Sequence, residues 1–109
     1  MSRYTVRRTG GRGQPEAVPP RVTVVIPNWN GERFLKLCLG SLRDQSFKDF
    51  ETVLVDNGST DGSIAFVKED FSEVNVVPLG ENRGIAAAFN AGIEASTAEL
   101  IVLLNNDTE

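Results

Sequence analysis

Short apolar runs rich in β-branched residues alternate with helical segments along this chain, and this alternation most constrains its fold. The runs are predicted to be buried strands, and they cover residues 22–26, 50–55, 74–78 and 99–104. The intervening segments are predicted to be helices on the basis of apolar spacing and composition, and they cover residues 32–44, 62–70 and 85–96. Strands that alternate with helices predict an α/β fold with a mostly parallel sheet and helices on both faces.

Local sequence signals suggest where these elements begin and end. Pro27 is expected to end the first strand, because proline cannot donate a ladder hydrogen bond. Asn30 is expected to cap the first helix. The segment before the second helix is rich in turn-forming residues and offers three candidate caps, namely Ser59, Thr60 and Asp61.

The charge is divided unevenly between a short N-terminal segment and the rest. Residues 1–21 carry five arginines and one glutamate, so their net charge is +4 within a chain of −4, which leaves −8 for residues 22–109. Residues 1–21 are also rich in glycine and proline, and we expect a disordered basic tail. The acidic remainder, residues 22–109, forms the expected domain and argues against a nucleic-acid partner.

Several classes of protein are excluded by composition. With one cysteine and no histidine, the chain offers no internal disulfide, no Cys/His zinc site and no histidine-based triad. No apolar run approaches the about 20 residues needed to span a bilayer, so no transmembrane segment is expected. Without a secretory h-region, we expect a cytoplasmic protein, or one held peripherally at the inner face of the membrane.

Polar residues follow each predicted strand, where open parallel sheets bind ligands. They lie in residues 27–32, 56–59, 81–84 and 105–107. The chain has neither the glycine fingerprint of dinucleotide-binding domains nor a phosphate-binding P-loop. A bound diphosphate therefore needs another source of positive charge, and Mg²⁺ or Mn²⁺ on a carboxylate after the fourth strand would supply it.

The ordered set of these motifs resembles family 2 glycosyltransferases of the GT-A fold, in particular a rhamnosyltransferase-like branch. The motifs are Val22-Thr-Val-Val-Ile-Pro-Asn-Trp-Asn-Gly-Glu32, Val55-Asp-Asn-Gly-Ser-Thr-Asp-Gly62, Asn82-Arg-Gly-Ile-Ala-Ala-Ala-Phe-Asn-Ala-Gly92 and Leu103-Leu-Asn-Asn-Asp-Thr108. The resemblance implies a Rossmann-like, nucleotide-sugar-binding half of a GT-A domain.

The resemblance also implies a role for each motif. Asp56 would accept a hydrogen bond from a uracil or thymine base, and Asp107 would hold the metal. The remaining residues would line the nucleotide-sugar pocket, and they are Pro27, Asn28, Trp29, Asn30, Glu32, Asn82, Arg83, Gly84 and Asn106. Some of these have purely structural alternatives: Asp56 could serve only as a turn residue, and Arg83 only as a solvated charge.

For the whole enzyme, the resemblance implies transfer of a sugar from a UDP- or dTDP-linked donor to an acceptor hydroxyl, with inversion. The acceptor would be a glycan or a lipid-linked molecule in cell-surface polysaccharide synthesis. No catalytic base is expected within the chain, since the family's base lies past the metal motif and hence beyond Glu109. By itself the chain would be inactive, with a non-catalytic nucleotide-binding module as the alternative, and the fourth strand would form an exposed apolar edge.

Overall fold

A computed structural model describes residues 3–7, as backbone, and residues 20–106. Its elements in chain order are β1 (Arg3–Arg7), β2 (Val22–Asn28), α1 (Glu32–Arg43), β3 (Phe50–Asp56), α2 (Ser63–Asp70), β4 (Asn75–Pro78), α3 (Ile85–Ala95) and β5 (Leu100–Leu104). The strands form one sheet in the order β1-β5-β2-β3-β4. In these described ranges, no helix combines the length and apolarity that a membrane crossing needs.

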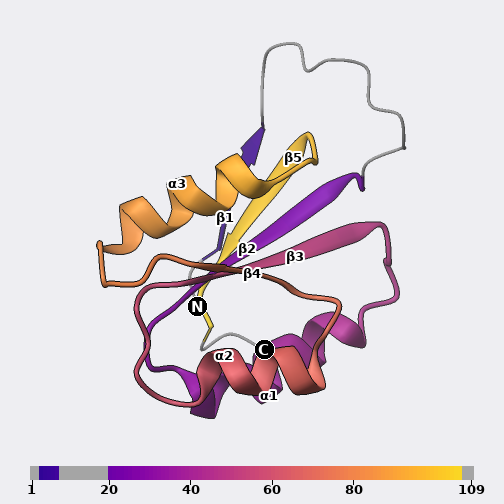
Figure 1. Cartoon of the computed structure of the whole chain (residues 1–109). Helices are drawn as coiled ribbons and strands as arrows, with labels where there is room; N and C mark the ends of the chain where they lie inside the picture. The colour runs from indigo at the N-terminus through magenta and orange to yellow at the C-terminus, as the bar shows by residue number, and fades with distance from the viewer. Residues whose placement is uncertain (1–2, 8–19, 107–109) are drawn as a thin grey trace.

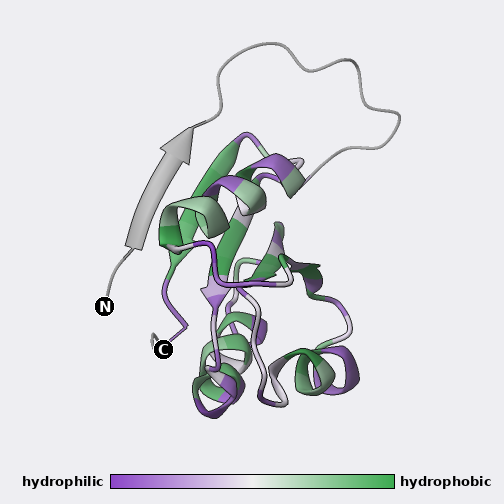
Figure 2. Cartoon of the chain, turned by 60° about the vertical axis from the view of Figure 1, so that its left-hand side comes forward, coloured by the Kyte–Doolittle hydropathy of each residue, from purple (hydrophilic) through white to green (hydrophobic). Residues whose placement is uncertain are grey.

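The four strands β2 to β5 are parallel, and helices cover both faces of the sheet. Figure 1 shows α3 on one face and α1 with α2 on the other. Each face has its own apolar cluster: one is centred on Ile26, Leu35 and Leu54, and the other on Val25, Val53 and Ala88. Figure 2 shows the hydrophobic strands between helices that carry both hydrophobic and hydrophilic residues. The predicted mostly parallel sheet with helices on both faces is confirmed.

Helix α3 lies unusually close to the sheet at Gly92. A Cβ atom added at Gly92 would meet Cγ1 of Val25 on β2, and Val25 is fully buried. The missing side chain therefore sets the distance between α3 and the middle of the sheet. This packing also places the start of α3 at the edge where the parallel strands end.

The sheet differs from the sequence prediction at its N-terminal strand. Residues Arg3–Arg7 form β1, which pairs antiparallel with β5 from Arg3–Leu104 to Arg7–Leu100, instead of belonging to a disordered tail. Strand β5 therefore lies between β1 and β2, and the expectation that it forms an exposed edge is wrong. The pairing of β1 with β5 is made by backbone hydrogen bonds. The side-chain composition of the N-terminal segment, which is rich in glycine and arginine, therefore did not reveal it. The remainder of the expected tail, residues 8–19, lies outside the described residues.

Two predicted boundaries also differ from the structure. Strand β2 continues through Pro27 to Asn28, because its pairing with β5 stops at Val25 while its pairing with β3 continues. The carbonyl of Asn28 accepts a hydrogen bond from Asn57 N on the β3 side. The backbone nitrogen of Pro27 thus faces the unpaired side, where a missing N–H costs nothing. Helix α1 is capped by Gly31 rather than by Asn30, whose side chain is used elsewhere.

Candidate functional site

A cleft of about 270 Å³ lies at the edge where the parallel strands end. Five residues predicted to bind a nucleotide sugar line it, and they are Pro27, Asn28, Trp29, Asn82 and Asn106. Asn57, Ile85 and Asn105 complete the lining. The loops that follow β2, β3, β4 and β5 therefore converge at one place, as expected for an open parallel sheet.

Asp56 lies beneath this cleft and anchors the loop that follows β3. Its Oδ1 accepts hydrogen bonds from Asn28 Nδ2 at 3.0 Å and from the Ser59 hydroxyl at 2.7 Å, and its Oδ2 accepts the Ser59 N–H at 2.8 Å. The residue is only 1% exposed, and these donors compensate the cost of burying it. Asp56 thus holds the loop in place, and Oδ2 retains a lone pair for a further donor.

A second set of contacts joins the loops after β2 and β5. Asn106 Nδ2 donates to Asn28 Oδ1 at 2.7 Å. Gly31 makes this contact possible, because a Cβ atom at Gly31 would meet Asn106 Nδ2 and lie 2.5 Å from Asn28 Oδ1. The side chain of Asn28 therefore connects the Asp56 loop with the segment that follows β5.

Asn57 positions the loop that leads into α3. Its Nδ2 donates to the carbonyl of Gly84 at 3.1 Å, and its Oδ1 accepts the Arg83 N–H at 2.9 Å. Asn82 Oδ1 accepts the Gly84 N–H at 2.9 Å, and Gly84 has a φ of 87°, which a side chain would disfavour. Asn82 thus lines the cleft, while Arg83 and Gly84 do not, and both are held through their backbones.

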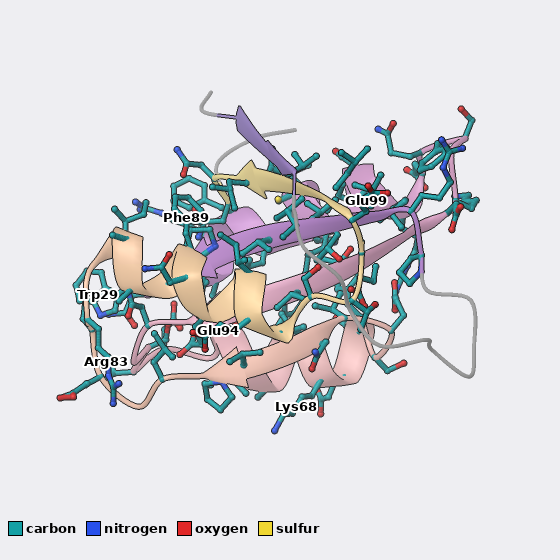
Figure 3. The ribbon with its side chains drawn as sticks, turned by 90° about the horizontal axis from the view of Figure 1, so that it is seen from above. Trp29, Lys68, Arg83, Phe89, Glu94 and Glu99 are labelled. Atoms are coloured by element: carbon teal, nitrogen blue, oxygen red, sulfur yellow. The ribbon has the colours of Figure 1, made fainter. Side chains whose placement is uncertain are left out.

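The mouth of the cleft carries exposed apolar groups. Trp29 is 55% exposed and Ile85 is 57% exposed, although both line the cleft. Figure 3 shows Trp29 and Arg83 at the same end of the molecule, beside the start of α3. Arg83 Nε lies 3.5 Å from a carboxylate oxygen of Glu81. An exposed indole next to an exposed aliphatic side chain provides a surface on which a flat ring can lie.

Asn30 and Glu32 lie apart from the cleft, in a separate open hollow of about 680 Å³. Asn30 Oδ1 accepts the N–H groups of Thr60 at 2.7 Å and of Asp61 at 3.1 Å. Glu32 Oε1 accepts the Gly62 N–H at 3.0 Å, and the Glu32 N–H in turn donates to Asp61 at 3.2 Å. Both residues thus join the starts of α1 and α2, which was not predicted for them.

The pKa of Asp61 reflects its position between these two helix starts. Partial burial acts to raise the pKa of Asp61, but hydrogen bonds from Ser63 and from the backbone N–H of Glu32 outweigh it and hold the pKa below its ordinary value. Asp61 Oδ1 accepts the Ser63 N–H at 3.0 Å, at the first residue of α2. The prediction that Ser59, Thr60 or Asp61 caps α2 is wrong, because Gly62 occupies the cap position. Asp61 lies one residue before the cap, and its carboxylate nevertheless accepts the first N–H of the helix.

The described part of the chain contains no cluster of three or more acidic, cysteine or histidine side chains that could enclose a metal. Asp107, the predicted metal ligand, lies outside the described residues. Its neighbour Asn106 uses Nδ2 in the contact with Asn28, and no hydrogen bond in residues 20–106 occupies its Oδ1. Amide and carboxylate oxygens are the donors that Mg²⁺ and Mn²⁺ prefer, so the residues at this position fit such an ion.

Four residues of the site were not given individual ligand roles from the sequence. Asn57, Ser59 and Asn105 belong to the polar segments 56–59 and 105–107 that were expected at this edge, but Ser59 was named individually only as a helix cap, and Ile85 was given no role. Asn57 and Ser59 directly follow a buried strand beside Asp56, and their polar side chains could have suggested inward hydrogen bonds. For Ile85 the only signal was an apolar residue at the start of a helix, which periodicity alone assigns to the core.

Comparisons with known proteins agree with this geometry. The family model for glycosyl transferase family 2 matches residues 23–109. The glycosyltransferase GlyA of Streptococcus pneumoniae is 37% identical over 93 residues, which cover 83% of this chain and 13% of GlyA. The chain spans between 13% and 36% of the length of the curated relatives compared.

Solved structures show the same fold. A mannosyltransferase from Pyrobaculum calidifontis, solved with GDP-Man and Mn²⁺, superimposes with a TM-score of 0.75 at 31% identity, over 83% of this chain and 28% of that one. TarS of S. aureus, solved with UDP, superimposes with a TM-score of 0.74 at 27% identity, over 80% of this chain and 27% of that one. The fold is the Rossmann-like GT-A fold, and the chain belongs to glycosyl transferase family 2.

Proposed function

We propose that this chain forms the donor-binding half of a glycosyltransferase that uses a nucleotide-diphosphate sugar. The observation that carries the proposal is the convergence of Trp29, the Asp56 loop and Asn106 on one cleft at the carboxyl edge of the parallel sheet. Any open parallel sheet brings these loops together, but the fold does not require asparagines and an exposed tryptophan to line their cleft. Solved relatives that bind GDP-Man or UDP support the proposal.

Within this proposal the cleft divides into a base side and a phosphate side. On the base side, Trp29 and Ile85 offer apolar surfaces for the nucleoside, and Oδ2 of Asp56, beneath the cleft, would accept a ring N–H of the base. Asn82, together with Arg83 and Gly84, would border the sugar and phosphates next to the start of α3. The first N–H groups of a helix are well suited to bind a phosphate.

On the phosphate side, we assign the metal to Asp107 with Asn106. When bound there, Mg²⁺ or Mn²⁺ would stabilise negative charge on the diphosphate as a Lewis acid. The chain's own contribution would be the carboxylate of Asp107 and the amide oxygen of Asn106, which accepts no hydrogen bond from residues 20–106. The mannosyltransferase solved with Mn²⁺ supports this choice of ion.

The finer parts of the proposal concern donor, acceptor and stereochemistry. We propose a UDP- or dTDP-linked hexose or rhamnose as donor, a glycan or lipid-linked acceptor, and inversion at the anomeric carbon. The general base would lie in residues beyond Glu109, so that this chain alone binds the donor but does not turn it over. We place the reaction on the cytoplasmic side of the membrane. The GDP-Man complex of the mannosyltransferase makes GDP sugars the first alternative donors to test.

Calorimetric titration tests the proposal directly. The purified chain is titrated with UDP, dTDP and GDP, each with and without Mn²⁺, in parallel with Asp107→Ala. A matched control is Asp44→Ala, because Asp44 lies at the far end of α1. We expect one nucleotide to bind in a metal-dependent manner, and we expect Asp107→Ala but not Asp44→Ala to abolish the metal effect.

Three results would contradict parts of the proposal. A folded chain that binds none of the three nucleotides would contradict the donor site as a whole. Binding that is equal with and without Mn²⁺ would contradict the metal assignment alone. Turnover of a nucleotide sugar by residues 1–109 with an added acceptor would contradict the placement of the base beyond Glu109.

A further inference from the structure

We propose that Asn57 is a positioning residue for the donor site, which fixes one wall of the cleft and does not itself bind the nucleotide sugar. This inference rests on the proposed function and refines it. The wall consists of Asn82 and Ile85, and both line the cleft. The two residues between them, Arg83 and Gly84, are the ones whose backbone groups Asn57 holds.

Asn57 is itself fixed at the carboxyl edge of the sheet. It directly follows the last residue of β3, and its N–H donates to the carbonyl of Asn28, the last residue of β2, at 2.7 Å. The residue is only 5% exposed, so its side-chain amide needs hydrogen-bond partners within the protein. Its backbone is therefore a fixed support for the groups that its side chain binds.

Three consecutive peptide groups next to the wall are held by asparagine side chains. Asn57 Oδ1 accepts the Arg83 N–H at 2.9 Å, and Asn57 Nδ2 donates to the Gly84 carbonyl at 3.1 Å. Between these two contacts, Asn82 Oδ1 accepts the Gly84 N–H at 2.9 Å. The Gly84 carbonyl also accepts the Ala88 N–H at 3.2 Å, at the start of α3. Asn57 thus fixes the segment through which the chain enters α3, and the wall with it.

Gly58 provides a second observation at the same junction. Its φ is 80°, and a Cβ atom added there would lie 2.6 Å from Cα and 2.7 Å from the carbonyl carbon of Glu81. Both of these atoms belong to the backbone, so the clash could be relieved only if one loop moved away from the other. The loops after β3 and β4 are therefore in close backbone contact beside Asn57, and a side chain at position 58 would separate them.

The alternative role for Asn57 is a direct contact with the ligand, because Asn57 also lines the cleft. The two roles predict different results for a substitution that moves the wall and leaves the Asn57 amide in place. Gly58→Ala is such a substitution, and Gly80→Ala is its matched control. Gly80 has a similar φ of 83°, but a Cβ atom there would meet nothing within 4 Å. Gly80→Ala therefore introduces the backbone strain without the clash.

A second set of variants acts on the amide itself. Asn57→Ala removes both hydrogen bonds, whereas Asn57→Asp keeps an acceptor for the Arg83 N–H but offers no donor to Gly84. Asn75→Ala is the control for loss of an asparagine side chain, since Asn75 is exposed at the start of β4, away from the carboxyl edge. Each variant of the whole chain is titrated with UDP, dTDP and GDP in the presence of Mn²⁺. The backbone amide signal of Arg83 is followed by NMR without ligand, and thermal melts test whether each variant is folded.

We expect Asn57→Ala to weaken binding of the nucleotide that the native chain prefers by about 5- to 150-fold, the effect of two lost hydrogen bonds. Asn57→Asp should lose less, about 2- to 12-fold, because the contact with Arg83 remains. Gly58→Ala should weaken binding by at least about fivefold, whereas Gly80→Ala and Asn75→Ala should stay within about twofold of the native chain. The Arg83 amide proton should exchange faster in Asn57→Ala and keep its protection in Asn57→Asp.

Two outcomes would overturn the inference. A merely structural role for Asn57 would lower the melting temperature of Asn57→Ala and leave the nucleotide affinity of the folded protein unchanged. Weak binding by Asn57→Ala together with native binding by a folded Gly58→Ala would show that Asn57 contacts the ligand directly. Should Asn57→Ala fail to fold, Asn57→Asp and the comparison of Gly58→Ala with Gly80→Ala still decide between these roles. A native chain that binds none of the three nucleotides would instead contradict the proposed function.

Discussion

Replacing Gly92 by alanine should destabilise the protein, although the same substitution usually stabilises a helix. Alanine at a helix interior position is favoured over glycine by about 1 kcal/mol. Against this, the new Cβ atom would meet Cγ1 of the fully buried Val25, and overpacking a core costs about 1–3 kcal/mol. Valine has few alternative rotamers, so the upper part of that range applies and the net loss is about 1–2 kcal/mol.

Urea unfolding followed by circular dichroism measures this loss, and a thermal melt should show a decrease of about 5–15 °C. Gly40→Ala is the control: its Cβ atom meets nothing within 4 Å, so it should gain about 0.5–1 kcal/mol. In the double variant Val25→Ala/Gly92→Ala, the total loss of stability should be smaller than the sum of the two single losses by about 1 kcal/mol or more. The methyl group of the new alanine at position 92 then occupies the space that the valine side chain has vacated. Equal stability of Gly92→Ala and Gly40→Ala would refute the inferred close contact between α3 and β2.

Three further outcomes are expected. Ser59→Ala removes a hydroxyl that donates to Asp56 and accepts from Asn30 N at 2.8 Å, so urea unfolding should show a loss of about 1–3 kcal/mol, whereas the exposed Ser72→Ala should change stability by less than about 0.5 kcal/mol. The pKa of Asp61 is below its ordinary 3.8, and the pKa of Glu73 is below its ordinary 4.5 because its own backbone N–H and Arg43 outweigh the effect of burial. A carboxyl group with a lowered pKa in the folded state stabilises the fold at pH values above its unfolded-state pKa. This stability is lost as the pH falls through the folded-state pKa. Unfolding measured against pH should therefore have a smaller acid slope in Asp61→Asn and in Glu73→Gln, and an unchanged slope in both would contradict these hydrogen bonds. Deleting residues 1–7 removes β1 and uncovers the edge of β5, so sedimentation should reveal oligomers or aggregates; a monomer with native stability would show that β1 contributes nothing.

The parallel core was predictable because its signals are local and redundant. Each inner strand is a continuous apolar run, and α1 has an apolar stripe with Leu35 and Cys38 at helical spacing. The boundaries of most elements agree with the prediction within one or two residues. Strand β1 was missed although Tyr4, Thr5 and Val6 favour strands, because the segment is short, precedes a glycine- and proline-rich stretch, and pairs only where β5 leaves backbone groups open.

At the site, the sequence indicated which loops meet but not which side chains face the cleft. Asn30 and Glu32 lie within three residues of Trp29 in the same motif. They nevertheless turn toward α2, because Thr60, Asp61 and Gly62 offer N–H groups there. Such a choice between two partners depends on three-dimensional distances. The ligand roles of Asp56, Asn82 and Arg83 remain predictions, as does that of Asp107.

The contacts around Asn30 and Glu32 have a consequence for how the protein opens. Asn30 receives N–H groups from Thr60 and Asp61, and Glu32 exchanges hydrogen bonds with Asp61 and Gly62. Neither loop can then leave its place without breaking the contacts of the other. The two loops form a single cooperative unit, whose amide protons should exchange with solvent at one common opening free energy. The starts of α1 and α2 would therefore separate in one step or stay joined.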